Sequence, residues 1–252
     1  MYNLSKKITL LLLVLSMHVK AIAQSDKESE NNPKNLIKLN LTSLILKNYN
    51  FQYERVLNKR ISVVLGYRFM PNGPLPFQKT FISTSNDPAN ALGNFRLSNS
   101  AITPELRFYA GKKGYGHGFY FAPFYRYANF KPSGITINFT YDAGNPATMD
   151  LSGDVRGNSF GLLIGAQWSL AKNISLDWQI IGAHSGKSDG LISGVASRTH
   201  SASEQANILT KLKEIDWPLI TETYSVTSNG ASMILNGPWG GLRAGLTLGI
   251  KF

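Results

Sequence analysis

The chain has 252 residues, with 26 Lys and Arg against 15 Asp and Glu, a formal net charge of +11, and no cysteine. The absence of cysteine excludes a disulfide framework, a cysteine-linked lipid anchor and thiolate metal sites. The basic residues are scattered singly and form no basic run or basic helix, so nucleic acid is not an expected partner.

The N-terminal segment has the pattern of a secretory signal peptide. Two lysines precede an apolar run over 8–15, and a small-x-small motif ends at Ala23. The apolar run is too short to cross a membrane as a helix. We therefore expect residues 1–23 to be removed, leaving 23 basic residues against 15 acidic ones, a net charge of +8. The polar stretch 24–34 is then expected to be a short disordered periplasmic leader.

Eight segments alternate apolar and polar side chains with a period of two, which predicts β-strands with one apolar face. They cover 36–46, 49–56, 61–69, 101–110, 119–128, 159–170, 174–183 and 242–252. Each is close to the length of about nine to eleven residues that a tilted transmembrane strand needs. No segment reaches the length of about twenty apolar residues of a transmembrane helix, so any membrane span must be built from strands.

The connections between the predicted strands are sorted by length. Those at 58–60, 111–118 and 172–173 are short, whereas those after the third, fifth and seventh strands are long. Short periplasmic turns and long extracellular loops are typical of outer-membrane barrels. We therefore predict an all-β fold for residues 35–252, an antiparallel up-and-down transmembrane β-barrel with eight strands. The very short connection at 47–48 is an exception to this sorting.

Three features of the strands and loops leave alternatives open. The segments 135–141 and 224–227 also alternate, so they are either extensions of neighbouring strands or two additional strands, giving ten. Pro123 lies in the middle of the fifth strand and lacks a ladder donor, which predicts a bulge there. In the last loop, the capping-box spacing of Ser201 and Glu204 predicts a helix near 203–216. This helix either plugs the barrel or binds a partner, or it packs on its own hairpin.

The sequence resembles the small outer-membrane barrels of Gram-negative bacteria. The resemblance rests on the signal ending Ala21-Ile-Ala-Gln24, on Phe51-Gln-Tyr-Glu-Arg55 followed by Ile61-Ser-Val-Val-Leu-Gly66, and on the ending Gly240-Gly-Leu-Arg-Ala-Gly-Leu-Thr-Leu-Gly-Ile-Lys-Phe252. It is similar to uncharacterised barrel families with a Tyr-Glu-Arg second strand and an Arg-x-Gly-x-x-x-Gly last strand, and more distantly to OmpA-, OmpX- and OmpW-like barrels. The resemblance implies this fold and a location in the cell outer membrane, and it supplies no activity to transfer.

A location in the outer membrane suggests partners for the basic chain. We expect outer-membrane lipids and the phosphates of anionic glycolipids to interact with its lysines and arginines, and we expect a monomer. The resemblance also implies that the barrel assembly machinery recognises the C-terminal strand.

Deletion of Phe252 is accordingly expected to impair membrane insertion while leaving secretion intact. The measurement is heat-modifiable migration of the protein in gel electrophoresis, and normal migration of the truncated chain would contradict the prediction.

The sequence carries no arrangement of residues that indicates a catalytic, cofactor or metal site, so we expect none of the three. The pair His184-Ser185 suits a lipid A deacylase-like enzyme in its place on the seventh strand, but adjacent strand residues point to opposite faces. The other histidines of the mature chain, His117 and His200, lie far away in the sequence. The glycine-rich segment 111–118 lacks a Gly-Lys-Ser/Thr ending and a following helix, so it is interpreted as a turn rather than a phosphate loop.

The preferred hypothesis is therefore a structural or surface-binding role carried by the extracellular loops, without catalysis. The alternatives are a barrel-embedded lipid-modifying enzyme that uses His184 and Ser185, and a narrow channel for small solutes. Eight strands enclose an interior that side chains just fill, which disfavours an open pore.

Charged residues fall on the predicted inner face and form two groups, with Arg107 and Arg243 also facing inward. Near the outer end the first group contains Arg68, Glu105 and Arg126; near the periplasmic end the second contains Asp177, Lys251, Lys38 and Glu54. Each group places opposite charges on neighbouring strands, so we expect hydrogen-bonded ion clusters. The alternative is a set of independently solvated charges in a water-filled interior.

Overall fold

The computed structural model describes residues 33–78, 94–111, 113–140, 146–213 and 219–252. The predicted signal peptide and most of the predicted leader lie outside these ranges. The elements are β1 (Asn35–Asn40), α2 (Leu41–Ile45), β2 (Tyr49–Val56), β3 (Ile61–Gly73), β4 (Arg96–Tyr109), β5 (Gly118–Ser133), β6 (Ile135–Thr140), β7 (Pro146–Ala171), β8 (Ile174–Ala196), α4 (Ala202–Lys213), β9 (Thr221–Thr227) and β10 (Gly230–Lys251).

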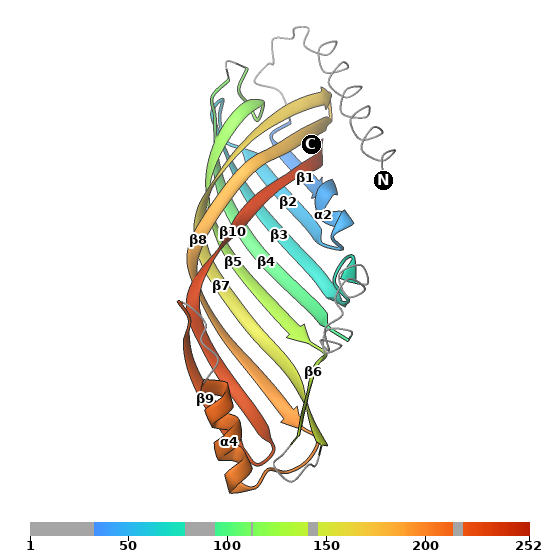
Figure 1. Ribbon diagram of the computed structural model, residues 1–252. Helices are drawn as coiled ribbons and strands as arrows, with labels where there is room; N and C mark the ends of the chain where they lie inside the picture. The colour runs from blue at the N-terminus through green and yellow to red at the C-terminus, as the bar shows by residue number, and fades with distance from the viewer. Residues whose placement is uncertain (1–32, 79–93, 112, 141–145, 214–218) are drawn as a thin grey trace, which may run out of the picture.

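Eight strands form a closed antiparallel ring (Figure 1). They pair in the order β1-β2-β3-β4-β5-β7-β8-β10, and β10 returns to pair with β1. The remaining two strands lie off the ring, where β6 pairs with β7 and β9 pairs with β10. The prediction of an all-β, up-and-down sheet is confirmed. The two additional alternating segments are strands, but the ring itself has eight members.

The two ends of the ring differ in their connections, as the sequence predicted. The connections 57–60, 110–117 and 172–173 lie together at one end, at the top of Figure 1, which we call the short-turn end. The connections through α2, β6 and α4 and the one between β3 and β4 lie at the other, which we call the long-loop end. The sorting follows from the antiparallel order, because alternate connections return to the same end of the ring.

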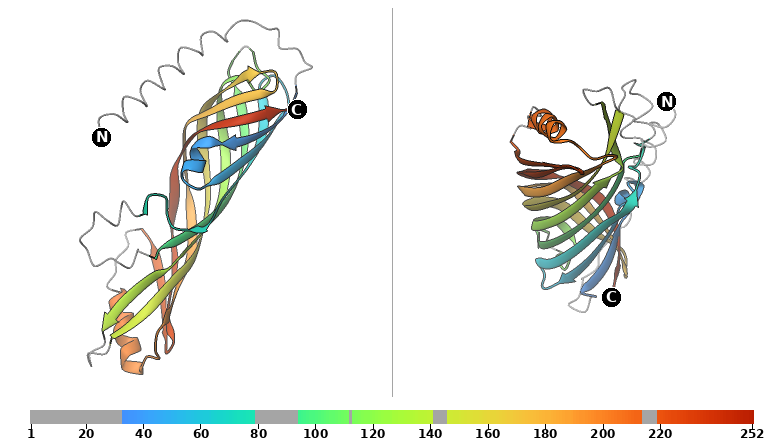
Figure 2. Two further views of the ribbon diagram at one scale, coloured as in Figure 1. Left: turned by 90° about the vertical axis from the view of Figure 1, so that its right-hand side faces the viewer. Right: turned by 90° about the horizontal axis from the view of Figure 1, so that it is seen from below.

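Three strands continue far beyond the ring at the long-loop end. The strands β7, β8 and β10 contain 26, 23 and 22 residues, and with β6 and β9 they form a five-stranded extension, which we call the outer sheet (Figures 1 and 2). The predicted strands 159–170, 174–183 and 242–252 were therefore too short. The missed part of β8 is rich in glycine and serine, which have low strand propensity, and only its pairing with β7 and β10 makes it a strand.

The first strand is shorter than predicted, because a helix replaces its second half. β1 ends at Asn40, whose side chain accepts a hydrogen bond from the Ser43 amide at 2.9 Å and caps α2. β1 consequently pairs with β10 only from Leu36↔Lys251 to Asn40↔Thr247. The predicted strand over 41–46 is wrong, since capping by Asn40 outweighs the alternating pattern there.

The predicted bulge at Pro123 is also wrong. β5 pairs with β7 in unbroken register through Pro123↔Leu162, and its register with β4 is the same at Glu105↔Phe124 and at Phe108↔Phe121. The strand accommodates proline as a local interruption of the β4 ladder rather than by an extra residue.

The predicted helix in the last loop is present as α4, and it lies outside the ring. Its capping box is complete: the Glu204 amide donates to Ser201 Oγ at 3.3 Å, and the Ser201 amide donates to Glu204 Oε2 at 2.8 Å. Hydrogen bonds from the Arg198 guanidinium hold the pKa of Glu204 below its ordinary value. The described part of α4 packs beside β9 (Figures 1 and 2), which favours packing on its own hairpin over a plug. Within the described ranges, no helix has both the length and the apolar character to cross a membrane.

Candidate functional site

The outer face of the ring is apolar, which reverses the usual arrangement of a water-soluble protein. Large hydrophobic side chains there are between 37% and 77% exposed. They are Ile37, Phe51, Tyr53, Val63, Leu65, Tyr67, Ile102, Leu106, Phe119, Phe121, Phe160, Leu162, Ile164, Trp178, Ile181, Leu242, Leu248, Ile250 and Phe252. They come from all eight strands of the ring, so the apolar surface encircles it. We call this surface the apolar belt.

Aromatic residues lie on this outer face near both ends of the ring. At the short-turn end, Tyr53, Phe119 and Trp178 are exposed; toward the long-loop end, Tyr49 and Phe160 are exposed. Several rings pack on neighbouring rings along the surface. Tyr49 and Phe69 stack with centroids 5.2 Å apart, and Tyr125 and Phe160 pack in a tilted arrangement with centroids 5.0 Å apart. The rings therefore stand at the rims of the belt rather than in a core.

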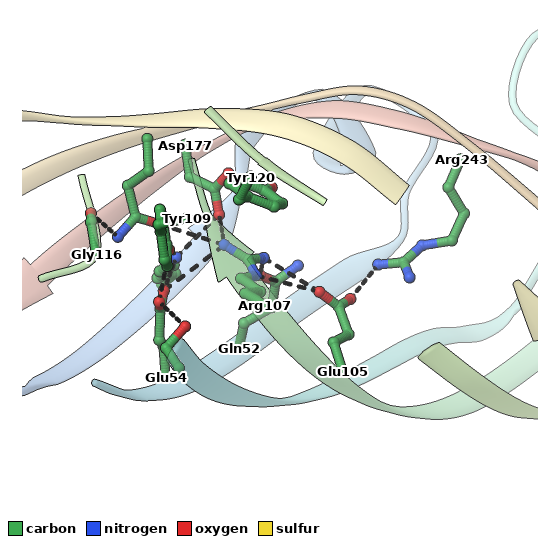
Figure 3. Close-up of polar contacts among 12 residues, drawn as sticks. Gln52, Glu54, Glu105, Arg107, Tyr109, Gly116, Tyr120, Asp177 and Arg243 are labelled. Carbon is green, nitrogen blue, oxygen red and sulfur yellow. Dashed lines mark hydrogen bonds and ion pairs between the residues drawn. The ribbon is translucent and has the colours of Figure 1, made fainter. Parts of the chain in front are cut away.

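The inner face carries a buried cluster of charges, which we call the charged plug. Its members are Lys38, Glu54, Glu105, Arg107 and Asp177, all with at most 4% of their surface exposed. They come from β1, β2, β4 and β8, so the cluster spans the ring from wall to wall (Figure 3). The alternation of each strand places these side chains inward because their neighbours belong to the apolar belt.

Arg107 is the centre of the plug. Its Nη1 lies 2.6 Å from Asp177 Oδ2 and 3.6 Å from Glu54 Oε2, and its Nη2 lies 3.2 Å from Glu105 Oε2. The guanidinium carbon is 4.4 Å from the centre of the Tyr120 ring. A guanidinium that is stacked and paired in this way is held in one orientation.

Lys38 completes the plug by bridging two of the carboxylates. Its ammonium is 2.9 Å from Asp177 Oδ2 and forms an ion pair with Glu54. Tyrosine hydroxyls donate to the same carboxylates, Tyr109 to Glu54 Oε1 at 2.8 Å and Tyr120 to Asp177 Oδ1 at 2.7 Å. The predicted grouping of Lys38, Glu54 and Asp177 is thereby confirmed.

The fourth predicted member of that group, Lys251, is also buried and faces inward, with its ammonium donating to Ser169 Oγ at 2.5 Å. Gln167 is fully buried and donates to the carbonyl of Gly116 at 2.8 Å, so the plug is tied to the 110–117 turn. Among the described residues, the charged side chains of this half of the interior are at most 5% exposed, unlike charges in a water-filled lumen. The alternative of independently solvated charges is therefore wrong for this half.

The outer predicted group is paired differently from the prediction. Glu105 was expected to pair with Arg68 and Arg126, but its ion-pair partners are Arg107, on the same strand, and Arg243, whose Nη2 lies 2.7 Å from Glu105 Oε1 (Figure 3). Arg243 reaches Glu105 across the interior from β10. Sequence adjacency of strands could not show this contact, because it joins opposite walls of the ring.

His184 and Ser185 do not form a common site. β8 passes through both residues in unbroken register, with His184↔Gly161 followed by Ser185↔Phe160. The His184 ring lies inside, with its centroid 6.0 Å from that of Phe124, whereas Ser185 is exposed on the outer face. The steric expectation that adjacent strand residues diverge is confirmed.

The other two histidines lie at opposite ends of the molecule. His117 belongs to the 110–117 turn at the short-turn end, and His200 precedes α4 at the far end of the outer sheet. The structure therefore brings neither of them to His184.

Residues 8–189 of the chain match the protein family described as "Protein of unknown function (DUF3575)". The chain belongs to this family. The match covers the signal-like segment and the ring from β1 to most of β8, and leaves β9 and β10 outside it. No curated protein and no solved structure matches the chain. Membership therefore agrees with an uncharacterised, barrel-like protein and carries no activity.

Proposed function

We propose that this chain is a monomeric outer-membrane β-barrel protein that acts through its outer sheet and long loops, in a structural or surface-binding role without catalysis. The observation that carries the proposal is the inverted polarity of the ring. Its outer face is the apolar belt, and its inner face is the charged plug. The distant likeness to OmpA-, OmpX- and OmpW-type barrels stays a prediction from sequence.

Membrane insertion explains both faces with one physical argument. In hydrocarbon, apolar side chains are favoured on the outside, and backbone N–H and C=O groups must be paired. The strand ladders of the ring provide this pairing, except along the β10 edge over 237–246, which has no strand partner on one side within the described ranges. In water the same belt would be a large exposed apolar surface of the kind that soluble monomers avoid. Aromatic rings at both rims of the belt match the headgroup levels of a bilayer.

The interior argues against the channel and enzyme alternatives. Arg107, Lys38, Glu54 and Asp177 are at most 1% exposed and fill the interior near the short-turn end, which disfavours an aqueous path for ions past these residues. The enzyme hypothesis needs His184 beside a nucleophile, and Ser185 points out of the ring instead. The surface that remains for binding is the outer sheet with α4.

Single-cysteine labelling of intact cells tests the topology, because the chain has no cysteine of its own. Ser203→Cys lies on the exposed side of α4, and Lys172→Cys lies in an exposed short turn. A maleimide that cannot cross membranes is expected to label Ser203→Cys in intact cells and Lys172→Cys only after permeabilisation. If only Lys172→Cys is labelled in intact cells, the topology is the reverse of the proposed one. If neither variant is recovered as labelled protein in the outer-membrane fraction, the proposal is rejected.

A further inference from the structure

The charges inside the ring do not balance. Three cations, Lys38, Arg107 and Arg243, form ion pairs with three carboxylates, those of Glu54, Glu105 and Asp177. Two more arginines, Arg68 and Arg126, also face inward, and within the described part of the chain neither has a carboxylate at ion-pair distance. On the long-loop side of the plug, the inner face therefore carries an excess of two positive charges.

These arginines lie close to one another. Arg68 lies opposite Ala101, which lies opposite Ala128, so Arg68 is close in register to Arg126 on the inner face. Arg243 lies over the ring of Phe124, two residues from Arg126. Arg126 is only 7% exposed, and its guanidinium makes one long contact, from Nη1 to Thr103 Oγ1 at 3.5 Å. A buried guanidinium with so few acceptors is unfavourable unless an anion or water supplies them.

Unused polar atoms face the same region. Arg68 Nε, Arg243 Nη1 and His184 Nδ1 are buried without a hydrogen-bond partner among the described residues. His184 belongs to the group because its ring lies 6.0 Å from the Phe124 ring, over which the Arg243 guanidinium also lies. Buried polar atoms nearly always have a hydrogen-bond partner in native proteins, so these three unpaired nitrogen atoms in one region indicate that a hydrogen-bond partner is missing.

Aromatic rings hold the guanidinium groups in place. The guanidinium carbon of Arg243 lies 4.5 Å from the centre of the Phe124 ring, and that of Arg68 lies 6.0 Å from the centre of the Phe130 ring. Phe130 in turn packs against Trp239 in a tilted arrangement, with centroids 5.3 Å apart. Stacking leaves the edges of the guanidinium planes, which carry the N–H donors, for an acceptor.

We propose that Arg68, Arg126, Arg243 and His184, the arginine cluster, bind a phosphate group inside the ring. A phosphate carries about −1.5 to −2 charges at neutral pH and several acceptor oxygens, which matches two unpaired guanidinium groups. The inference goes beyond the proposed function and does not depend on the location of the protein.

The group can belong to a free phosphate or to a lipid headgroup. On the side of the ring, β10 pairs with β9 only up to Asn236 and with β1 only from Thr247. Within the described ranges its edge over 237–246, which includes Arg243, has no strand partner on that side.

Calorimetric titration of the purified mature protein in detergent with inorganic phosphate tests the proposal. Saturable binding is expected for the unmodified protein, and Arg68→Gln with Arg126→Gln should weaken it at least about tenfold, the loss expected for charge-assisted hydrogen bonds. The control is Arg60→Gln with Arg156→Gln, which removes the same charge from exposed positions and should leave the affinity unchanged. Equal affinity of the two double variants would overturn the proposal.

Nanodiscs separate the two sources of phosphate. If phosphatidic acid added to phosphatidylcholine nanodiscs competes with inorganic phosphate, the site takes a lipid headgroup; if it does not compete, the site takes soluble phosphate. The absence of saturable binding of either by the unmodified protein would overturn the proposal whatever the variants do. The variant Arg68→Gln with Arg126→Gln removes the repulsion between the two arginines, so its urea unfolding midpoint in phosphate-free buffer should not fall. An unchanged midpoint shows that weaker phosphate binding comes from loss of the site and not from loss of the fold.

Discussion

Replacement of Asp177 by alanine is expected to lower the free energy of unfolding by about 3–5 kcal/mol, the range for breaking a fully buried ion pair from one side. Asp177 is completely buried and lies between Lys38, Arg107 and the Tyr120 hydroxyl. Its removal leaves both cations buried inside the ring with one carboxylate fewer. The measurement is urea unfolding in detergent micelles or bilayers.

The matched control is Asp154→Ala on the outer sheet. Asp154 pairs with Arg156 at 3.3 Å, but both side chains are partly exposed, at 34% and 53%. A surface ion pair of this kind contributes at most about 1 kcal/mol. Equal loss of stability in Asp154→Ala and Asp177→Ala would show that the plug is hydrated and contributes no more than the surface pair.

Glu105→Ala is expected to destabilise the ring by about 3 kcal/mol or more, and the additional change Arg243→Ala should return part of that loss. The reason is that Glu105 is the ion-pair partner of Arg243, which without it faces Arg68 and Arg126 across the interior. A double-mutant cycle from urea unfolding measures the coupling between the two residues.

The comparison for this cycle is Glu105→Ala combined with Arg68→Ala. Arg68 forms no ion pair with Glu105 in the structure, so its removal relieves repulsion but restores no broken pair, and the recovery should be smaller. If Arg68→Ala restores more of the free energy of unfolding than Arg243→Ala, Glu105 pairs with the arginines of the neighbouring strands, as strand adjacency predicted.

Much of the ring could be predicted from the sequence because alternation is a local property. The period of two places Lys38, Glu54 and Asp177 inward and Phe51, Leu65 and Ile250 outward without knowledge of any neighbour. Short turns likewise follow from the chain, because an antiparallel hairpin needs few residues. The order of the ring strands is therefore contained in the pattern, whereas the choice between eight and ten strands needed the structure.

Features that depend on competition between local signals were harder to predict. Asn40 begins a helix inside an apparent strand because its side chain caps the first turn, and Pro123 remains in register because its strand is held on the other side by β7. The outer part of β8 forms a strand only because β7 and β10 are present on both sides of it. Propensity alone could not decide these cases.

The sequence by itself determined which side chains of the ring face inward and where the short turns lie, and it left eight or ten strands open. Only the tertiary structure decided which charges meet. The contacts of Arg243 with Glu105 and of Arg107 with Asp177 join opposite walls, and the closure of β10 on β1 creates them. The physical reason is that alternation fixes the direction of a side chain from its own strand, whereas a contact across the interior depends on the register of every strand between.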